Sequence, residues 1–154
     1  MEKLIKSLER HEGRKNKLYM DSEGNISGGI GHYFKVGSYL PDEVIDILFK
    51  VDIATAISEF NKIDINLRKK LNINRKRVIT EMIFNMGPRG VMGFKQMWVC
   101  IAKDDFDGAA DNMLWNFHPD GSRTPTPWST EVGDGPGRRF DRADELAEIM
   151  RKGE

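Results

Sequence analysis

The chain has 154 residues, 39% of them hydrophobic and 31% charged, and its 24 basic and 24 acidic residues give a formal net charge of zero. This size and composition predict one domain with a hydrophobic core of its own, and they exclude a disordered chain. The charge balance argues against a generally basic nucleic-acid binder. The single cysteine, Cys100, excludes an intramolecular disulfide.

Turn residues and apolar spacing divide the chain into elements that are mostly helical. Residues 2–12 place apolar side chains at helical spacing, and the pattern stops at Gly13. Residues 18–34 contain short apolar pieces separated by glycines and polar turns, which is typical of a small antiparallel hairpin or meander. Further helices are predicted over 42–61, 74–86, 92–102, 105–116 and from the end of Gly135–Gly137 to Arg151.

These elements predict a mostly helical α+β fold, built as a single domain of two lobes. We expect an N-terminal lobe over about 13–41 with the small sheet, a linking helix over about 42–61 and a C-terminal helical lobe over about 62–154. Residues 1–12 are expected to pack near the helical lobe. The stretch 117–137 is rich in proline and glycine and is predicted to be a loop.

The zero net charge conceals a local excess of positive charge. Residues 62–77 contain seven basic residues and one acid, whereas residues 104–154 contain twelve acids and six bases. The basic segment predicts a patch for an anionic polymer, either a nucleic acid or a cell-wall polymer; a solvated helix face and loop is the plainer explanation. It lacks the interleaved aromatic residues that stack on single-stranded nucleic acid.

The three histidines are not spaced as in known metal-binding motifs. His11 and Glu12 begin like a zinc-protease helix, but Lys15 occupies the position of the second histidine. His32 and His118 have no companion at metal-ligand spacing. We therefore predict no metal site.

Two carboxylates near the N-terminus point to a different chemistry. Glu12 lies at a helix end beside apolar positions, where desolvation favours the protonated carboxyl group, and Asp21 begins a polar turn that keeps it solvated and ionised. Glycoside hydrolysis needs such a pair, one acid to protonate the leaving oxygen and one base or nucleophile across the sugar ring. Ser27, six residues after Asp21, can hold a water by hydrogen bonding.

Several stretches resemble the phage-type lysozymes, which are endolysins. The segments similar to the active-site signature of that family are His11–Gly13, Tyr19–Gly24 and Ser27–His32. A second stretch of the family resembles Phe84–Phe94, and its closing segment resembles Gly135–Arg139 with the Ala-Asp-Glu-Leu helix that follows. The resemblance therefore covers most of the chain in the right order.

The resemblance implies a muramidase that cleaves the β-1,4 bond between N-acetylmuramic acid and N-acetylglucosamine, with inversion in a single displacement and without a cofactor. Glu12 would be the general acid, and Asp21 would position and deprotonate the attacking water. Ser27, where family members commonly have threonine, would help to hold that water. His32 would pair with Asp52 on the long helix in a structural role.

The resemblance also implies substrate contacts from the second lobe. Phe84 and Asn85 would face the cleft, and Arg138, or its neighbour Arg139, would approach the catalytic glutamate. Trp128 is predicted either to stack on a sugar or to anchor its own loop.

Partners and location follow as expectations. The implied partner is bacterial peptidoglycan, and we expect a monomer without nucleic-acid binding or stable membrane insertion. The chain has neither the apolar run of a signal peptide nor the roughly 18 apolar residues of a membrane span. We therefore expect it in the cytoplasm of the producing bacterium until a holin-type protein permeabilises the membrane. Two alternatives stay open, a lytic transglycosylase on the same polymer and a catalytically silent wall-binding module.

Overall fold

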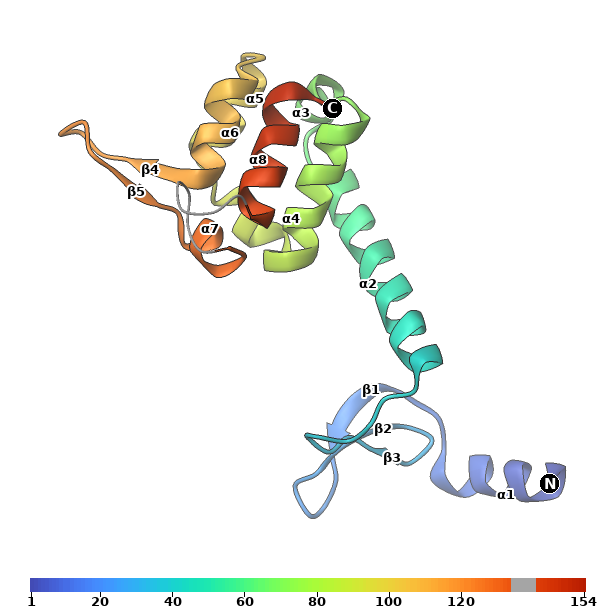
Figure 1. Cartoon of the computed structure of the whole chain (residues 1–154). Helices are drawn as coiled ribbons and strands as arrows, with labels where there is room; N and C mark the ends of the chain where they lie inside the picture. Colours follow the sequence, from blue (N-terminus) through green and yellow to red (C-terminus); the bar gives the residue numbers. More distant parts are fainter. Residues whose placement is uncertain (134–140) are drawn as a thin grey trace. The chain divides into compact units, whose positions relative to one another are not determined.

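A computed structural model describes residues 1–133 and 141–154 of the chain (Figure 1). Its helices are α1 (Glu2–Glu12), α2 (Asp42–Lys62), α3 (Ile65–Lys70), α4 (Ile73–Met92), α5 (Lys95–Ala102), α6 (Phe106–Leu114), α7 (Pro127–Glu131) and α8 (Arg142–Lys152). Its strands are β1 (Lys15–Met20), β2 (Ile26–Gly29), β3 (His32–Tyr33), β4 (Trp115–Phe117) and β5 (Arg123–Pro125). The predicted α+β class, mostly helical with a small N-terminal sheet and one long helix, is confirmed.

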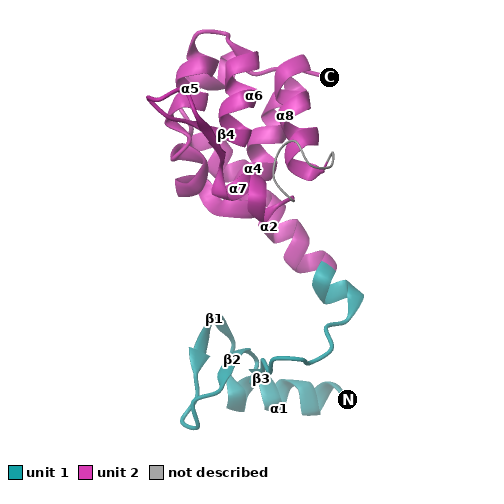
Figure 2. Cartoon of the chain, turned by 60° about the vertical axis from the view of Figure 1, so that its left-hand side comes forward, with its two compact units in different colours: residues 1–45 teal, residues 46–154 magenta. Residues whose placement is uncertain are grey.

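The chain divides into two compact units, Met1–Ile45 and Asp46–Glu154 (Figure 2). The first unit holds α1 and the three-stranded antiparallel sheet β1-β2-β3. The second unit holds most of α2, the remaining helices and the two-stranded sheet β4-β5. The predicted lobe boundaries, and the packing of residues 1–12 near the helical lobe, stay predictions.

The sheet of the first unit depends on short strands and tight turns. Tyr19 of β1 lies opposite Ser27 of β2, and Gly28 of β2 lies opposite His32 of β3. Gly31, in the turn between β2 and β3, has a φ of 69°, a left-handed conformation that favours glycine. Glycine at this position therefore permits the tight turn that follows β2, the strand that contains Ser27.

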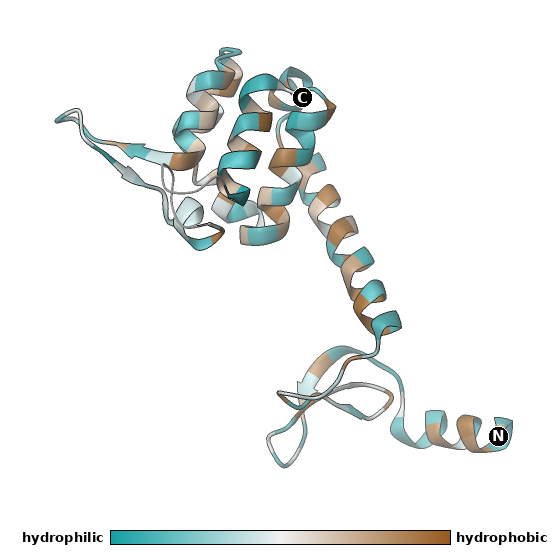
Figure 3. Ribbon diagram, in the orientation of Figure 1, coloured by the Kyte–Doolittle hydropathy of each residue, from teal (hydrophilic) through white to brown (hydrophobic). Residues whose placement is uncertain are grey.

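Helix α2 is the long helix that the sequence predicts. Asp42 and Glu43 lie in its first turn and Lys62 in its last turn, an arrangement that suits the helix dipole. Hydrophobic residues recur along its length (Figure 3). Ala56 and Phe60 are buried, so the C-terminal half of the helix contributes to the core.

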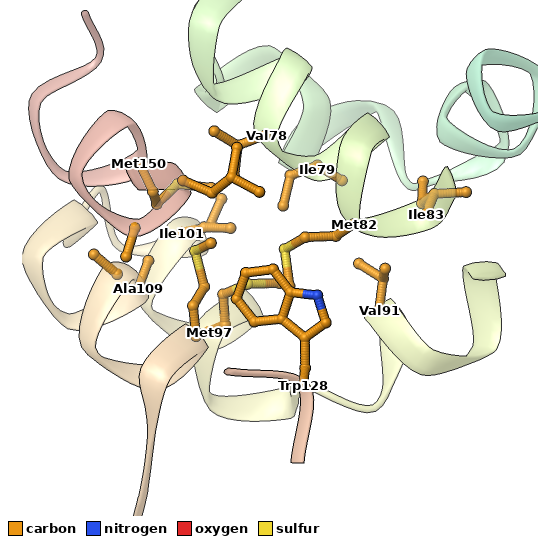
Figure 4. Packing of buried hydrophobic residues seen from close by; sticks show 14 of the residues in the cluster. Val78, Ile79, Met82, Ile83, Val91, Met97, Ile101, Ala109, Trp128 and Met150 are labelled. Carbon is orange, nitrogen blue, oxygen red and sulfur yellow. The ribbon is translucent and has the colours of Figure 1, made fainter. Parts of the chain in front are cut away.

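The hydrophobic core lies in the second unit. Its side chains with no exposed surface come from α4, α5, α6 and α8, and they are Val78, Ile79, Met82, Met97, Ile101, Ala109, Ala110, Met113 and Met150 (Figure 4). Burying a large apolar side chain stabilises the fold by about 1.5 to 3 kcal/mol. The four methionines of this set have flexible side chains that fill irregular gaps between helices.

The range of α4 contains a break, so it is not one continuous helix. The helix predicted over 74–86 does end at Gly87–Pro88, because Gly87 has a non-helical backbone (φ 76°, ψ 167°), and the helical stretch that follows it to Met92 was not predicted. Glycine tolerates the positive φ at that kink. Pro88 follows at the start of a new helical turn, where a backbone N–H would have no helical partner, so the N–H that proline lacks is not missed. The short helix α3 was not predicted; Asp64 caps it by accepting a hydrogen bond from the Asn66 backbone N–H at 2.7 Å.

The prediction of a loop over 117–137 is wrong for much of that stretch. It contains the end of β4, all of β5 and α7, and Thr126 caps α7 by accepting a hydrogen bond from the Ser129 backbone N–H at 3.1 Å. Trp128 is only 4% exposed and meets Phe94 edge to face, with ring centroids 6.3 Å apart. Its indole anchors α7 in the core, so it does not offer a stacking surface to a sugar.

Candidate active site

Glu12 is the last residue of α1 and lies against the turn between β2 and β3. The helix ends because Gly13 adopts a φ of 69° and donates its backbone N–H to the carbonyl of Glu9. A Cβ atom placed on Gly31 would lie 3.0 Å from Oε2 of Glu12. Glycine at this turn therefore leaves the space that the Glu12 carboxylate occupies.

The desolvation that we expected around Glu12 is not provided by the first unit. Within that unit Glu12 is exposed, and none of the residues Glu2–Glu12 is buried. The apolar side chains of α1, such as Leu4 and Leu8, are themselves about half exposed, at 57% and 48%. The apolar spacing in the sequence predicted the helix correctly, and the desolvation of its last residue stays a prediction.

Asp21 lies in the turn between β1 and β2, where its carboxylate is held by hydrogen bonds. Oδ1 accepts from the backbone N–H groups of Glu23 (2.9 Å) and Asn25 (2.8 Å), and Oδ2 accepts from the side-chain amide of Asn25 (3.1 Å). These hydrogen bonds, with that of the Asn25 backbone as the largest cause, lower the pKa of the Asp21 carboxyl group. Asp21 is therefore ionised at neutral pH, as the polar turn predicts.

Ser27 is the buried polar residue of the small sheet. It is 6% exposed and lies on β2 between Tyr19 of β1 and Tyr33 of β3. Within residues 1–133 and 141–154, its hydroxyl group takes part in no hydrogen bond. The first unit thus contains all three residues that the sequence singles out for catalysis.

Asn25 is a site residue that the sequence pattern did not single out. The available signal was the run Asp21–Asn25, in which an aspartate is followed by Ser, Glu, Gly and Asn, residues that favour tight turns. That signal predicts a turn, but the contact of the Asn25 amide with the carboxylate depends on how the turn closes.

The predicted supporting pair is divided between the units. His32 belongs to the first unit, where its ring packs edge to face against that of Phe34, with the ring centroids 4.7 Å apart. Asp52 belongs to the second unit, where it borders a cavity of about 360 Å³ together with Phe84 and Gly87. The pairing of His32 with Asp52 stays a prediction.

The predicted substrate-binding residues belong to the second unit. Phe84 is 42% exposed, and its ring lies 5.9 Å from that of Phe49, edge to face. Both rings line an apolar groove of about 710 Å³ formed mainly by α2 and α4. Asn85 is exposed on α4. Arg138 and its alternative Arg139 lie outside the described residues.

The basic segment 62–77 is partly structural. The Arg75 guanidinium lies 3.5 Å from the centre of the Phe106 ring and donates from Nε to the carbonyl of Met150 at 2.7 Å. Lys70 pairs with Asp104 at 2.5 Å. These contacts explain part of the positive charge by the packing of the helices, and a patch for an anionic polymer stays a prediction.

The described residues contain neither a candidate metal site nor a candidate membrane-spanning helix. Over 1–133 and 141–154, no three His, Cys, Asp or Glu side chains gather closely enough to hold a metal ion. In the same ranges, each helix is too short or too polar to cross a membrane.

Comparison with known proteins gives two matches. The phage lysozyme family matches residues 9–126, a stretch that includes Glu12, Asp21 and Ser27. A protein named probable T4-type lysozyme 2, from Dictyostelium discoideum, is 27% identical over an aligned region that covers 71% of this chain and 82% of the relative.

Proposed function

Because the chain belongs to the phage lysozyme family, and is thus a peptidoglycan-degrading glycoside hydrolase, we propose that it is an endolysin that inverts the anomeric carbon. The bond cleaved is the β-1,4 bond from N-acetylmuramic acid to N-acetylglucosamine. The observation that carries the proposal is the pair of carboxylates in the first unit, Glu12 beside the Gly31 turn and Asp21 held ionised by its own turn.

Glu12 acts as the general acid. It protonates the glycosidic oxygen as the bond breaks, which lets the leaving sugar depart as an alcohol. Glu12 is exposed in the first unit, so its carboxyl group is accessible to the glycosidic oxygen of a bound sugar. The family resemblance implies that an arginine, Arg138 or Arg139, approaches Glu12.

Asp21 acts as the base. As an ionised carboxylate it orients a water toward the anomeric carbon and accepts a proton when that water attacks. The Ser27 hydroxyl holds the same water. This role is supported by the buried strand position of Ser27 and by the lack of a hydrogen bond from its hydroxyl to any residue of 1–133 and 141–154. Phe84 and Asn85 bind the glycan, and the His32–Asp52 pair supports the site, as the resemblance implies.

Lysis of permeabilised cells tests the role of Glu12. Purified wild-type protein lowers the turbidity of outer-membrane-permeabilised bacteria, and Glu12→Gln slows this by about 10²- to 10⁴-fold, because a lost general acid has that effect. Glu9→Gln, one turn earlier on α1, is the matched control and keeps full activity. A folded Glu12→Gln protein that lyses cells at the wild-type rate would contradict the assignment.

The products test the mechanism. Proton NMR of the first product formed from a soluble glycan shows the α anomer if the reaction inverts, and the β anomer would contradict a single displacement. Mass spectrometry of the same digest separates hydrolysis from the transglycosylase alternative, which leaves an anhydro sugar end. A wild-type protein that binds walls and releases no product would favour the silent binding module.

The proposed endolysin role implies where the enzyme is located in the cell and which partners it has. The enzyme accumulates as a monomer in the cytoplasm of the producing bacterium, binds no nucleic acid and reaches the wall after a holin-type protein opens the membrane. The support is the resemblance to endolysins. Expression in a bacterium tests this role: the culture keeps growing until chloroform permeabilises the membrane and then clears, whereas lysis without permeabilisation would contradict it.

A further inference from the structure

The two oxygens of the Asp21 carboxylate differ in their surroundings. A carboxylate offers about four lone-pair sites, two on each oxygen. Oδ1 already accepts two backbone N–H groups, those of Glu23 and Asn25, at 2.9 and 2.8 Å. Oδ2 accepts one donor, the Asn25 side-chain amide at 3.1 Å. Among residues 1–133 and 141–154, no second donor bonds to Oδ2, so one of its lone pairs is left for another partner.

We propose that Asn25 is a positioning residue for the hydrolytic reaction, whose side-chain amide orients the Asp21 carboxylate so that Oδ2 receives the proton of the attacking water. The inference rests on the proposed function, because it takes Asp21 as the base. Asn25 acts through Asp21 and touches neither the water nor the sugar.

The proton balance of the step is complete. The water oxygen forms a bond with the anomeric carbon while the bond from that carbon to the glycosidic oxygen breaks. The leaving oxygen takes the proton of Glu12, and the water gives its own proton to Oδ2 of Asp21. Solvent exchange then returns Glu12 to its protonated form and Asp21 to its ionised form.

The turn holds its shape through backbone bonds that do not involve the Asn25 amide. The Asp21 backbone N–H donates to the carbonyl of Asn25 (2.9 Å), and the Gly24 N–H donates to the carbonyl of Asp21 (3.1 Å). Gly24, with a φ of 82°, takes the left-handed position of the turn, so Asn25 needs no special backbone conformation. An alanine at position 25 therefore removes the amide and leaves the turn closed.

Neutral donors hold the Asp21 carboxylate. Among the described residues, the hydrogen bonds that lower its pKa come chiefly from the Asn25 backbone N–H, then from the Asn25 side chain and the Glu23 backbone N–H. The charged side chain in the same turn is that of Glu23, which bonds to Asp21 through its backbone N–H. The loss of one amide donor should therefore be visible in the acid limb of the activity profile.

The test is the pH dependence of kcat/KM, which reports ionisations of the free enzyme. Removing the amide raises the pKa of Asp21, so activity is lost at higher pH as the solution is acidified. We expect Asn25→Ala to move the acid limb to higher pH and to lower kcat several-fold, with KM unchanged. Asn25→Asp replaces the donor by a like charge and should move the limb further in the same direction.

Matched variants separate positioning from a structural role. Asn25→Gln keeps an amide donor and should lie between the wild type and Asn25→Ala. Ser22→Ala changes an exposed residue of the same turn and should reproduce the wild-type profile. A wild-type pH profile for Asn25→Ala, or an equal loss of activity at every pH together with a lower melting temperature, would overturn the proposal.

Asp21→Asn distinguishes this inference from the proposed function. If Asp21→Asn is inactive while Asn25→Ala follows the wild-type pH profile, Asp21 remains the base and the positioning role of Asn25 is wrong. If Asp21→Asn lyses cells at the wild-type rate, the base itself is wrong and the role of Asn25 falls with it.

Discussion

The two units of the chain are each stabilised internally, and by different means. Every apolar side chain that the structure describes as buried lies between Ala56 and Met150, in the second unit. In the first unit the buried positions are Ser27 and Gly28, and the chain is shaped by tight turns and strand pairing. The candidate catalytic residues belong to the unit without a large core. Stability and chemistry should therefore respond to different substitutions.

Truncation of the core should give the largest change in stability. Ile101 is fully buried in the second unit, and Ile101→Ala is expected to lower the free energy of unfolding by about 2 to 5 kcal/mol, because it removes buried methyl groups and leaves a cavity. Urea unfolding measures the loss. The rate of lysis below the melting transition should stay at the wild-type value.

The matched control is the same substitution on the surface of the same unit. Ile73 is 78% exposed, so Ile73→Ala should change the free energy of unfolding by less than about 0.5 kcal/mol. Equal losses for the two variants would mean that the second unit does not depend on its core in the way described.

A substitution in the first unit should have the opposite profile. Gly31→Ala places a Cβ atom 3.0 Å from Oε2 of Glu12, so the carboxylate has to move. A displacement of a catalytic group by a fraction of an ångström is expected to slow lysis by about tenfold or more. The strained backbone adds a cost of roughly 1 kcal/mol to folding of the first unit.

Gly29→Ala is the control for backbone strain. The φ of Gly29, 65°, is close to the 69° of Gly31, but a Cβ atom placed on Gly29 has no neighbouring atom within 4 Å. Gly29→Ala should therefore share the loss of stability and keep more of the activity. If the two variants lose activity equally, the contact between Gly31 and Glu12 has no catalytic consequence.

Long helices with a clear apolar period could be predicted from the sequence. Helix α1 was predicted with its exact bounds, and α2 to within one residue. The hairpin β4-β5 was missed because its strands have three residues each, which is too short for alternation to show. Helix α7 carried a usable signal, a threonine followed by proline at the first helical position, but the surrounding prolines and glycines favoured a loop.

The candidate site was predictable in part. The spacing of Glu12, Asp21 and Ser27, with the family resemblance, identified the catalytic candidates and the ionised state of Asp21. The exposure of Glu12 within the first unit could not be predicted, because helical periodicity shows which residues share a face of the helix and not what packs against that face. The burial of Trp128 was equally hidden, since its contact with Phe94 joins residues far apart in the sequence.

The cap of α6 gives a smaller effect in the second unit. The Asp105 carboxylate accepts a hydrogen bond from the Gly108 backbone N–H at 2.8 Å, and Asp105→Ala is expected to cost about 1 kcal/mol of stability. Asp105→Asn keeps an acceptor at the cap and should keep most of that stability. Thermal melts of the two variants make the comparison, and equal melting temperatures would exclude the cap as the cause.

The smallest expected effect is a change in the stability of the fold at acidic pH. It allows a direct comparison of one carboxyl group from each unit. Glu148 of the second unit accepts from Lys152 (2.8 Å) and Arg151 (2.7 Å), and these bonds lower its pKa. A carboxyl group whose pKa is lower in the folded state stabilises that state above the pKa of the unfolded chain, and the contribution is lost as the pH falls through the folded pKa.

Glu148→Gln should therefore lower the melting temperature slightly at pH 7, and the difference from the wild type should disappear as the pH falls through the folded pKa of Glu148. Asp21 of the first unit has a lowered pKa of the same sign, but its protonation should be seen first in the rate of lysis. A pH series that follows melting and lysis together measures both groups. Parallel loss of melting temperature and activity in the wild type and Glu148→Gln would show that the two units do not respond separately to acid.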